Sequence, residues 1–390
     1  MHKNIRLLTL FEFFLGFRFY TAVGIIYFIH ITGSYALALL VYSIVSITST
    51  VFEVPTGILS DRIGRKKTIV LGALFNLGAI IFYSIGQSFF ILTIGSILYG
   101  ISSSLFSGNN EALLFDSTRR IDKTSNYGKY IGIIKSMSQF GPAVAGVIGS
   151  FLANWSFVYL MWISVVPQLC CLVITLFIIE PKVHSEKISN NIFSDLRTAV
   201  AKFKNNSKLR TLSLASIIEF GIGETMYSFT PAFIATLWPL WAVGIARSFN
   251  NLCGTVGYLL AGKVMKKISA TRSMLWGEII CSMLALIAVI FPTVLTPILY
   301  GLASIPYGIN NVARDTLMQF EFSQEQRATM GSLNTLFGNL FFALFAFLFG
   351  FIADRVAANQ ALLTGEVLLL SLIYLYWKLF KNFKKLDYGF

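Results

Sequence analysis

The 390-residue chain has little charge. Asp, Glu, Lys and Arg together make up only 13% of it, about half the share of roughly 25% that is usual in soluble proteins. Apolar residues make up 55%, and they include uncharged blocks such as 68–84 and 90–107 that are long enough to cross a bilayer. These features exclude a soluble enzyme, a nucleic-acid-binding domain and a disordered chain, and they indicate a polytopic membrane protein.

Histidine and cysteine are also scarce. The three histidines, His2, His30 and His184, form no metal-binding or catalytic pair, and the sequence has no phosphate-binding glycine loop and no Gly-x-Ser-x-Gly elbow. We therefore expect neither an enzyme nor an ATP-driven transporter, and we expect no cofactor. The four cysteines all lie in apolar runs, which argues against a disulfide framework.

Apolar windows of about 20 residues predict an all-α fold with twelve transmembrane helices. Segments this long can satisfy their backbone polar groups in lipid only as helices. The first six predicted spans cover 7–30, 35–59, 68–86, 88–114, 129–153 and 156–180. The second six cover 211–236, 239–262, 273–292, 294–314, 329–352 and 357–377.

Lysine and arginine predict the orientation. They gather in alternate connections, at 62–67, 119–123, 181–210, 263–272 and 378–385. Five connections on the other side contain none, at 31–34, 86–89, 154–156, 236–240 and 292–296, and only Arg355 lies on that side. The positive-inside rule therefore places both termini in the cytoplasm, and this asymmetry accounts for the net charge of +13.

The predicted domains are two six-helix bundles, at 1–180 and 211–377, with a cytoplasmic linker at 181–210 and a cytoplasmic tail at 378–390. Five apolar linker residues share one helical face, which predicts an amphipathic helix on the membrane surface. These are Ile192, Phe193, Leu196, Val200 and Phe203.

The two halves of the sequence echo each other. Glu12-Phe13-x-x-Gly16-x-x-x-Tyr20 in the first span recurs with the same spacing as Glu219-Phe220-x-x-Gly223-x-x-x-Tyr227 in the seventh. In the same order, Asn109-Asn110 recurs as Asn310-Asn311, Phe140-Gly141 as Phe337-Gly338, and Gly57-x-Leu59 as Gly257-x-Leu259. A parallel repeat of six helices is the arrangement of many secondary transporters, whose substrate site lies between the halves.

Between the second and third spans the chain reads Gly57-Ile58-Leu59-Ser60-Asp61-Arg62-Ile63-Gly64-Arg65-Lys66-Lys67. This loop resembles the signature of the major facilitator superfamily, G-x-L-x-D-R-x-G-R-K/R-K/R. The resemblance implies a gate that closes the cytoplasmic side, built from Gly57, Asp61, Arg62, Gly64, Arg65, Lys66 and Asp116. Simple positive-inside anchoring would account for the lysines but not for Asp61 or the glycines.

Three contacts are expected in this gate. Asp61 should meet the N-terminus of span eleven near 331–334, where the helix dipole favours a carboxylate. Arg65 should pair with Asp116 at the end of span four. Gly57 should allow close helix approach, and Gly64 should permit a tight turn.

The fifth span carries a second, weaker resemblance. Gly141, Pro142, Gly146 and Gly149 are similar to the G-P-x-x-G-G motif of antiporters in this superfamily, although Ala145 replaces one glycine. The resemblance implies a kinked helix that packs tightly against span eight, and it favours export. A plain packing helix rich in Gly and Pro is the alternative.

Ionisable and amide side chains within the spans are the candidate functional residues, because burying them in a membrane is costly. The proton-coupling candidates are Glu12, Glu111, Glu219 and Glu224. The candidates for lining the substrate cavity are Arg18, Tyr20, Asn109, Asn110, Gln139, Tyr227, Arg247, Asn310 and Asn311. For each carboxylate the alternative is a static ion pair or helix cap, which we favour for Glu53, while Lys135 could simply reach to the interface and Glu366 has no assigned role.

The resemblance implies a secondary transporter that works by alternating access. We expect export of amphipathic or lipophilic small molecules, driven by the proton gradient across the plasma membrane, by a monomer whose partners are the substrate and the bilayer, with no nucleic acid. Drug exporters of this family usually carry an arginine in span four, and 89–114 has none, so Arg18 could take the cationic role. Uptake of a small polar or anionic solute, and flipping of a lipid-like substrate, remain alternatives.

Overall fold

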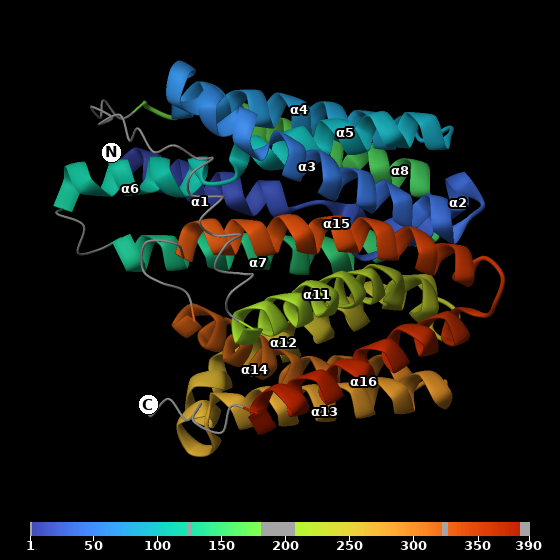
Figure 1. The fold of residues 1–390 in the computed structure, drawn as a ribbon. Helices are drawn as coiled ribbons and strands as arrows, with labels where there is room; N and C mark the ends of the chain where they lie inside the picture. Colours follow the sequence, from blue (N-terminus) through green and yellow to red (C-terminus); the bar gives the residue numbers. More distant parts are fainter. Residues whose placement is uncertain (1, 123–126, 181–206, 322–326, 383–390) are drawn as a thin grey trace. The chain divides into compact units, whose positions relative to one another are not determined.

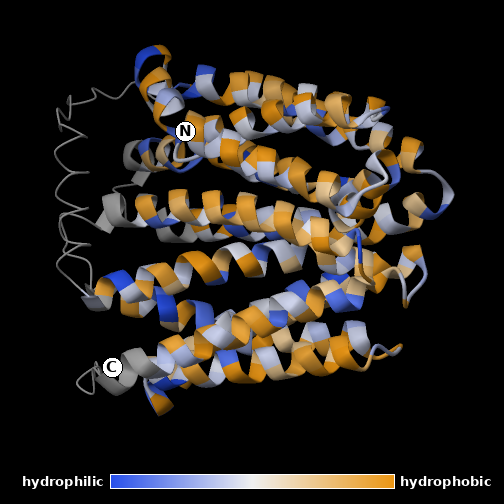
Figure 2. Cartoon of the chain, turned by 45° about the vertical axis from the view of Figure 1, so that its right-hand side comes forward, coloured by the Kyte–Doolittle hydropathy of each residue, from blue (hydrophilic) through white to orange (hydrophobic). Residues whose placement is uncertain are grey.

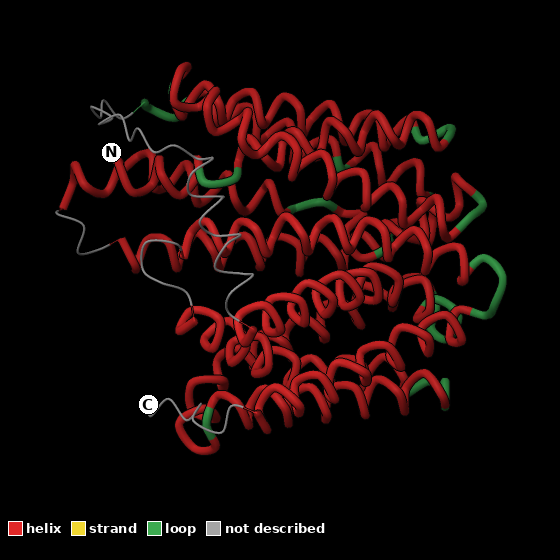
Figure 3. Tube along the Cα trace, viewed as in Figure 1, coloured by secondary structure: helices red, strands yellow, loops and turns green. Residues whose placement is uncertain are grey.

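The computed structural model describes residues 2–122, 127–180, 207–321 and 327–382. Every regular element in these ranges is a helix, and Figures 1 and 3 show these helices joined by short connections. The amphipathic helix predicted in the linker lies outside the described residues, as do the basic residue Lys123 and the tail from residue 383 onward. The chain divides into two compact units.

The first unit comprises residues up to 186 together with Pro239–Ile245. Its helices are α1 (His2–Gly16), η1 (Phe19–Ala22), α2 (Gly24–Thr32), α3 (Tyr35–Ile63), α4 (Arg65–Ile85), α5 (Phe89–Phe106), α6 (Asn109–Asp122), α7 (Tyr127–Trp155), α8 (Phe157–Ile163) and α9 (Val165–Leu176). Three of these helices, α3, α5 and α8, have a serine N-cap. Ser34, Ser88 and Ser156 each accept a hydrogen bond from a backbone N–H of the first turn.

The second unit comprises Lys187–Trp238 and Ala246–Phe390. Its described helices are α11 (Ser207–Ile234), α12 (Leu240–Ile268), α13 (Ala270–Ile290), α14 (Thr296–Glu321), α15 (Arg327–Ala353) and α16 (Ala358–Asn382). Residues Pro239–Ile245, which include the start of α12, belong to the first unit. The predicted bundle boundaries place them in the second bundle instead.

Eight helical segments among the described residues are long and apolar enough to cross a membrane. They are Tyr35–Ile63, Arg65–Ile85, Phe89–Thr118, Tyr130–Trp155, Phe157–Leu176, Ala270–Ile290, Leu333–Ala353 and Ala358–Trp377. The predicted spans at 7–30, 211–236, 239–262 and 294–314 are not among them, because they contain a helix break or polar and ionisable side chains. The count of twelve spans and the cytoplasmic termini therefore stay predictions.

Large apolar side chains lie on the outside of the helices. Trp155 is 79% exposed, Leu259 is 75% exposed and Phe90 is 72% exposed. Figure 2 shows apolar residues along most of the length of the helices of both units. Exposed apolar surface on this scale is unusual for a soluble protein, and it suits helices that face lipid.

The first predicted span is not one helix. The α-helix α1 ends at Gly16, and the short 3-10 helix η1 begins at Phe19. Side chains satisfy the carbonyl groups that this break frees: Gln168 Nε2 donates to Phe14 O at 3.2 Å, and Arg18 Nε donates to Leu15 O at 2.9 Å. Irregular backbone at membrane depth requires such protein partners.

The glycines of α7 pack against this broken first span. A Cβ at Gly141 would lie 2.4 Å from Phe13 O, and a Cβ at Gly149 would lie 1.7 Å from Phe19 O. The start of α12 lies against the next face of α7, where a Cβ at Gly244 would come within 2.3 Å of Gly146 O. The motif therefore packs against the start of α12, as expected from the resemblance, and also against α1 and η1, which was not expected.

The expectation of close helix approach at Gly57 is wrong within the first unit. A Cβ built at Gly57 would meet nothing within 4 Å in that unit's described residues. Helices α3 and α5 instead approach closely at Gly100, where a Cβ would lie 2.6 Å from Thr48 Cβ. The repeat counterpart Gly257 does allow close approach, because its Cβ would lie 2.2 Å from Ile305 O.

Candidate functional site

The signature loop is a turn between α3 and α4. Gly64 adopts φ +93°, which favours glycine and ends α3 sharply. Arg65 Nε lies 3.2 Å from Asp116 Oδ2, so the expected pair of these two residues is present. Asp61 and Arg62 are exposed. The meeting of Asp61 with span eleven and the role of the loop as a gate stay predictions.

Glu180 is an unexpected partner of the same loop. Its two carboxylate oxygens accept the backbone N–H groups of Arg65 at 3.0 Å and Lys66 at 2.7 Å. These are the first residues of α4, whose unpaired N–H groups and helix dipole both favour an anion. Glu180 therefore caps α4 and ties the loop to the end of the predicted sixth span.

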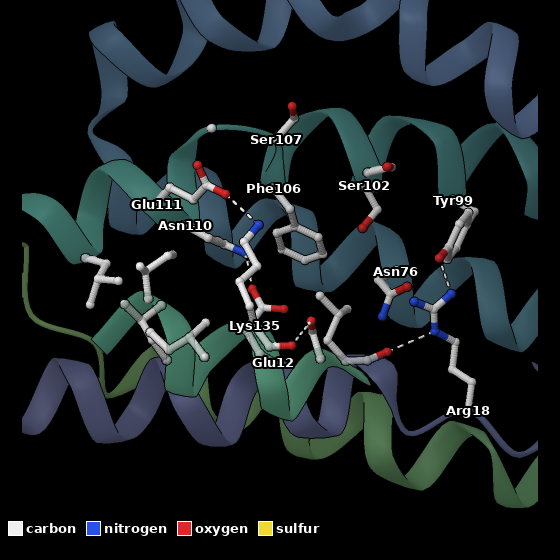
Figure 4. A pocket seen from close by; sticks show the side chains of 18 residues that line it. Glu12, Arg18, Asn76, Tyr99, Ser102, Phe106, Ser107, Asn110, Glu111 and Lys135 are labelled. Carbon is white, nitrogen blue, oxygen red and sulfur yellow. Dashed lines mark hydrogen bonds and ion pairs between the residues drawn. The ribbon is translucent and has the colours of Figure 1, made fainter. Parts of the chain in front are cut away.

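A cavity of about 410 Å³ opens within the first unit, and Figure 4 shows its walls. It lies among α1, α4, α5, α6 and α7. Its lining residues are Leu8, Glu12, Leu15, Arg18, Asn76, Tyr99, Ser102, Ser103, Phe106, Ser107, Gly108, Asn110, Glu111, Leu114, Ile131, Ile134, Lys135 and Ser138. Aliphatic and aromatic side chains thus alternate with hydroxyl, amide and charged groups, which is typical of a small-molecule site.

One end of the cavity carries three charges. Asn110 Nδ2 donates to Glu12 Oε1 at 2.9 Å, so the partner of Glu12 is a neutral amide. Lys135 Nζ lies 2.6 Å from Glu111 Oε1. The Lys135–Glu111 pair neutralises itself, which leaves Glu12 as the charge at this end that has no ion pair among the described residues.

Arg18 lies at the other end, close to Asn76 and Tyr99 (Figure 4). Its guanidinium hydrogen-bonds to the Tyr99 hydroxyl and lies 4.9 Å from the centre of that ring. These partners are neutral, and Arg18 itself lies in the break between α1 and η1.

Two amide oxygens of the lining lack a donor among the described residues. They are Asn76 Oδ1 and Asn110 Oδ1, and both are buried. Asn76 is held in place because its Nδ2 donates to Gln168 Oε1 at 2.6 Å. A buried polar atom without a partner is costly, so these two oxygens destabilise this arrangement of the lining unless a donor reaches them.

The second unit repeats the pairing of glutamate with asparagine. Asn310 Nδ2 lies 3.2 Å from Glu219 Oε1, as Asn110 lies beside Glu12 in the first unit. The repeat adds a cation here, because Arg314 Nη1 lies 2.6 Å from Glu219 Oε1. Asn311, the counterpart of Asn110 in the sequence repeat, instead donates to Tyr258 OH at 3.3 Å. The partner of the glutamate is therefore the second asparagine of the pair in the first unit and the first asparagine in the second.

Other predicted cavity residues of the second unit gather at α11 and α12. Arg247 Nη1 donates to Tyr227 O at 2.8 Å, and its guanidinium lies 3.2 Å from the centre of the Tyr227 ring. Tyr227 OH donates to Asn251 Oδ1 at 3.2 Å. The charge of Arg247 also acts on Glu224.

Three predicted cavity residues do not line the cavity of the first unit. Tyr20 is buried against Tyr83 in an edge-to-face contact. Asn109 is buried and hydrogen-bonds to Ser60 and to Leu105 O. Gln139 is exposed on α7.

Sequence reasoning missed several residues of these sites. Arg314 and Glu180 are each the last residue of a predicted span, at 294–314 and 156–180. Neither was therefore treated as an ionisable residue within the membrane. Asn76 and Tyr99 are polar residues in strongly apolar windows, which is a usable signal. Among the described residues, no group of three or more His, Cys, Asp or Glu side chains is placed to hold a metal ion.

A family model and several known proteins are similar to this chain. The family model described as Major Facilitator Superfamily matches residues 7–344. A transporter of Buchnera aphidicola subsp. Schizaphis graminum is 35% identical over 144 residues, which is 37% of this chain and 35% of that protein. The match thus spans about a third of that relative's length.

Two further similarities cover more of the chain. The quinolone resistance protein NorA of Staphylococcus aureus is 23% identical over 298 residues, which is 75% of this chain and 74% of NorA. The crystal structure of the nucleoside transporter NupG has a TM-score of 0.77 at 15% identity, and covers 98% of this chain and 100% of that one. The chain belongs to the Major Facilitator Superfamily, and it is an integral, multi-pass membrane protein.

Proposed function

We propose that the protein exports amphipathic small molecules across the plasma membrane by alternating access, in exchange for protons. The observation that carries this proposal is the position of Glu12 in a cavity of mixed polarity. Its carboxylate contacts a neutral amide, while apolar side chains such as Phe106 and Ile134 line the same space. A molecule with a protonated amine and an apolar body would complement both features.

Export of cationic amphipaths is favoured over other lipophilic compounds by the charges of the cavity. Lys135 pairs directly with Glu111 and acts on Glu12 without a direct ion pair, so its charge is shared between the two carboxylates. The relative NorA, whose name refers to quinolone resistance, supports export of compounds of this type.

Competition between a proton and the substrate for the carboxylate of Glu12 would couple the flux of protons to the flux of substrate. A buried carboxyl group in an apolar medium favours its neutral form unless a cation pairs with it. Glu12 could therefore hold either a proton or the substrate's ammonium group, but not both. Binding of one would expel the other, which is the basic requirement of an antiporter.

Uptake of a polar or anionic solute is the second candidate. The observation in its favour is that the guanidinium of Arg18 has neutral partners, Tyr99 and the Leu15 carbonyl. An anionic group would pair with Arg18, while Ser102, Ser103 and Ser107 could bind hydroxyl groups. In this case the protein would raise, rather than lower, the cellular content of its substrate.

Retention of a fluorescent cation in expressing cells distinguishes the candidates. We expect cells with the wild-type protein to retain less ethidium than cells without it, and a protonophore to abolish the difference. Glu12→Gln should retain ethidium like the empty cells. Glu53→Gln is the matched control, because Glu53 is exposed on α3 and does not line the cavity. Equal retention in all cells would contradict export of cations and would favour the Arg18 alternative.

A further inference from the structure

A cluster of buried ionisable side chains lies inside the second unit. Glu219 of α11, Glu278 of α13 and Glu366 of α16 are each only 4% exposed. Arg314 of α14 is 9% exposed, and it is the one cation among the buried side chains that the structure describes. Three carboxyl groups thus share one positive charge, so they cannot all be ionised at low cost.

Glu219 is the carboxylate that Arg314 neutralises. Its Oε1 lies 2.6 Å from Arg314 Nη1 and 3.2 Å from Asn310 Nδ2. Its Oε2 accepts a hydrogen bond from the Tyr376 hydroxyl. Glu219 therefore forms an ion pair with Arg314 and accepts two further hydrogen bonds from neutral donors.

Glu278 has no such cation. Asn310 Nδ2 donates to its Oε2 at 2.6 Å, and this donor is neutral. The groups whose charge acts on Glu278 are Glu219, Arg314 and Glu366, which come from the three other helices of the cluster. Two of these three are carboxyl groups, and Arg314 is already bound to Glu219, so an ionised Glu278 would be a buried anion that has only a share of one cation and neutral donors such as Ser282.

The side chain of Asn310 gives a second, independent reason to place a proton on Glu278. Its side chain is fully buried, and both of its N–H groups are used, one by Glu219 and one by Glu278. Its Oδ1, however, has no hydrogen-bond partner among the described residues. A carboxylic acid and an amide can join through two hydrogen bonds, and a proton on Glu278 would supply the donor that Asn310 Oδ1 lacks.

We propose that Glu278 is a proton-binding site, in which the protonated carboxyl group donates to Asn310 Oδ1 while accepting from Asn310 Nδ2. Protonation adds H⁺ to the carboxylate and breaks no other bond. The protonated site then carries no net charge beyond the Glu219–Arg314 pair. Release of the proton leaves Glu278 ionised beside the Glu219–Arg314 pair and Glu366, so it requires the Glu219–Arg314 pair to rearrange.

The role of this site in transport rests on the proposed function. If the protein is proton-coupled, rearrangement of the Glu219–Arg314 pair on proton release would link the charge state of Glu278 to movements among α11, α13 and α14. The site lies in the second unit, whereas the cavity around Glu12 lies in the first. Glu278 was not among the proton-coupling candidates taken from the sequence.

Infrared difference spectroscopy of the purified full-length protein tests proton binding without any substrate. The carbonyl-stretch band of a protonated carboxyl group is well separated from the bands of a carboxylate. We expect Glu278→Gln to lose one component of this band, and Glu366→Gln to keep that component. Asn310→Ala should shift it to higher wavenumber, because the acid loses its acceptor.

The contrary results are equally specific. An unchanged band in Glu278→Gln would show that Glu278 is ionised and would overturn the proposal. Disappearance of the component when sodium ions are added to the wild type would identify a metal-cation site instead, and would also overturn it. If Glu278→Gln fails to fold, the band shift in Asn310→Ala decides, since an ionised Glu278 would give no shift.

Transport by proteoliposomes separates this proposal from the proposed function. We expect Glu278→Gln to lose accumulation of ethidium against its gradient but to keep its passage down a gradient. If the wild type shows no flux driven by a pH gradient, the proposed function fails, while the infrared result still decides whether Glu278 binds a proton. If Glu278→Gln accumulates ethidium like the wild type, the site does not couple transport.

Discussion

The side-chain amide of Asn110 donates a 2.9 Å hydrogen bond to the carboxylate of Glu12. The same relationship recurs between Asn310 and Glu219 in the second unit. The two sites differ in their charge balance, because Glu219 also binds Arg314. The two halves of the repeat therefore differ at this position. Glu12 faces a cavity, whereas Glu219 is held in an ion pair.

The Glu219–Arg314 pair gives the first prediction. Arg314→Met should lower stability by about 3–5 kcal/mol, because it leaves a buried carboxylate without its cation. Glu219→Gln in the same chain should recover most of that loss, since it removes the stranded charge. Melting temperatures of the purified variants measure both effects, and an Arg314→Met variant as stable as the wild type would refute the importance of this pair.

Close packing of α7 gives the second prediction. Gly149→Ala should cost about 1–3 kcal/mol by overpacking, because its Cβ would lie 1.7 Å from Phe19 O. Gly132 lies on the same helix and has nothing within 4 Å of its Cβ. Gly132→Ala should therefore be neutral or stabilising by about 0.5–1 kcal/mol. Equal effects of the two substitutions on the melting temperature would count against the described packing of α7 on η1.

The pair in the signature loop gives the third prediction. The Arg65 side chain is 34% exposed and that of Asp116 is 8% exposed, so water screens their attraction in part. A double-mutant cycle with Arg65→Ala and Asp116→Ala should give a coupling energy of about 0.5–1 kcal/mol. Strict additivity of the two single substitutions would show that the contact contributes nothing to stability.

The cap of α4 gives the fourth prediction. Glu180→Ala should lower stability by about 0.5–2 kcal/mol, because two backbone N–H groups lose their acceptor. Glu180→Gln should lose less, since its amide oxygen still accepts a hydrogen bond but no longer carries the charge that the helix dipole favours. Glu53→Ala, an exposed glutamate on α3, is the control, and equal losses for Glu53 and Glu180 would contradict the capping role.

Much of the fold could be predicted because hydropathy follows directly from contact with lipid. Predicted spans such as 68–86 and 273–292 match α4 and α13 to within a few residues. The break at 17–18 could not be predicted, because a window of about 20 residues averages over it. It depends on partners such as Gln168, which is distant in sequence.

The candidate site was predictable in part for a similar reason. The internal repeat singled out Glu12, Asn110, Glu219 and Asn310, and the structure brings them together in pairs. The Lys135–Glu111 pair and the contact of Glu278 with Asn310 join different helices. No local pattern in the sequence encodes those distances, so they had to come from the tertiary structure.

The most direct test of the central claim is flux of ethidium in proteoliposomes that contain only the purified protein. With an imposed pH gradient, the account predicts that ethidium accumulates on the side richer in protons, that a protonophore abolishes this accumulation, and that Glu12→Gln does not accumulate it. Accumulation that is unaffected by the protonophore, or by Glu12→Gln, would contradict the account, as would the absence of any flux driven by the gradient.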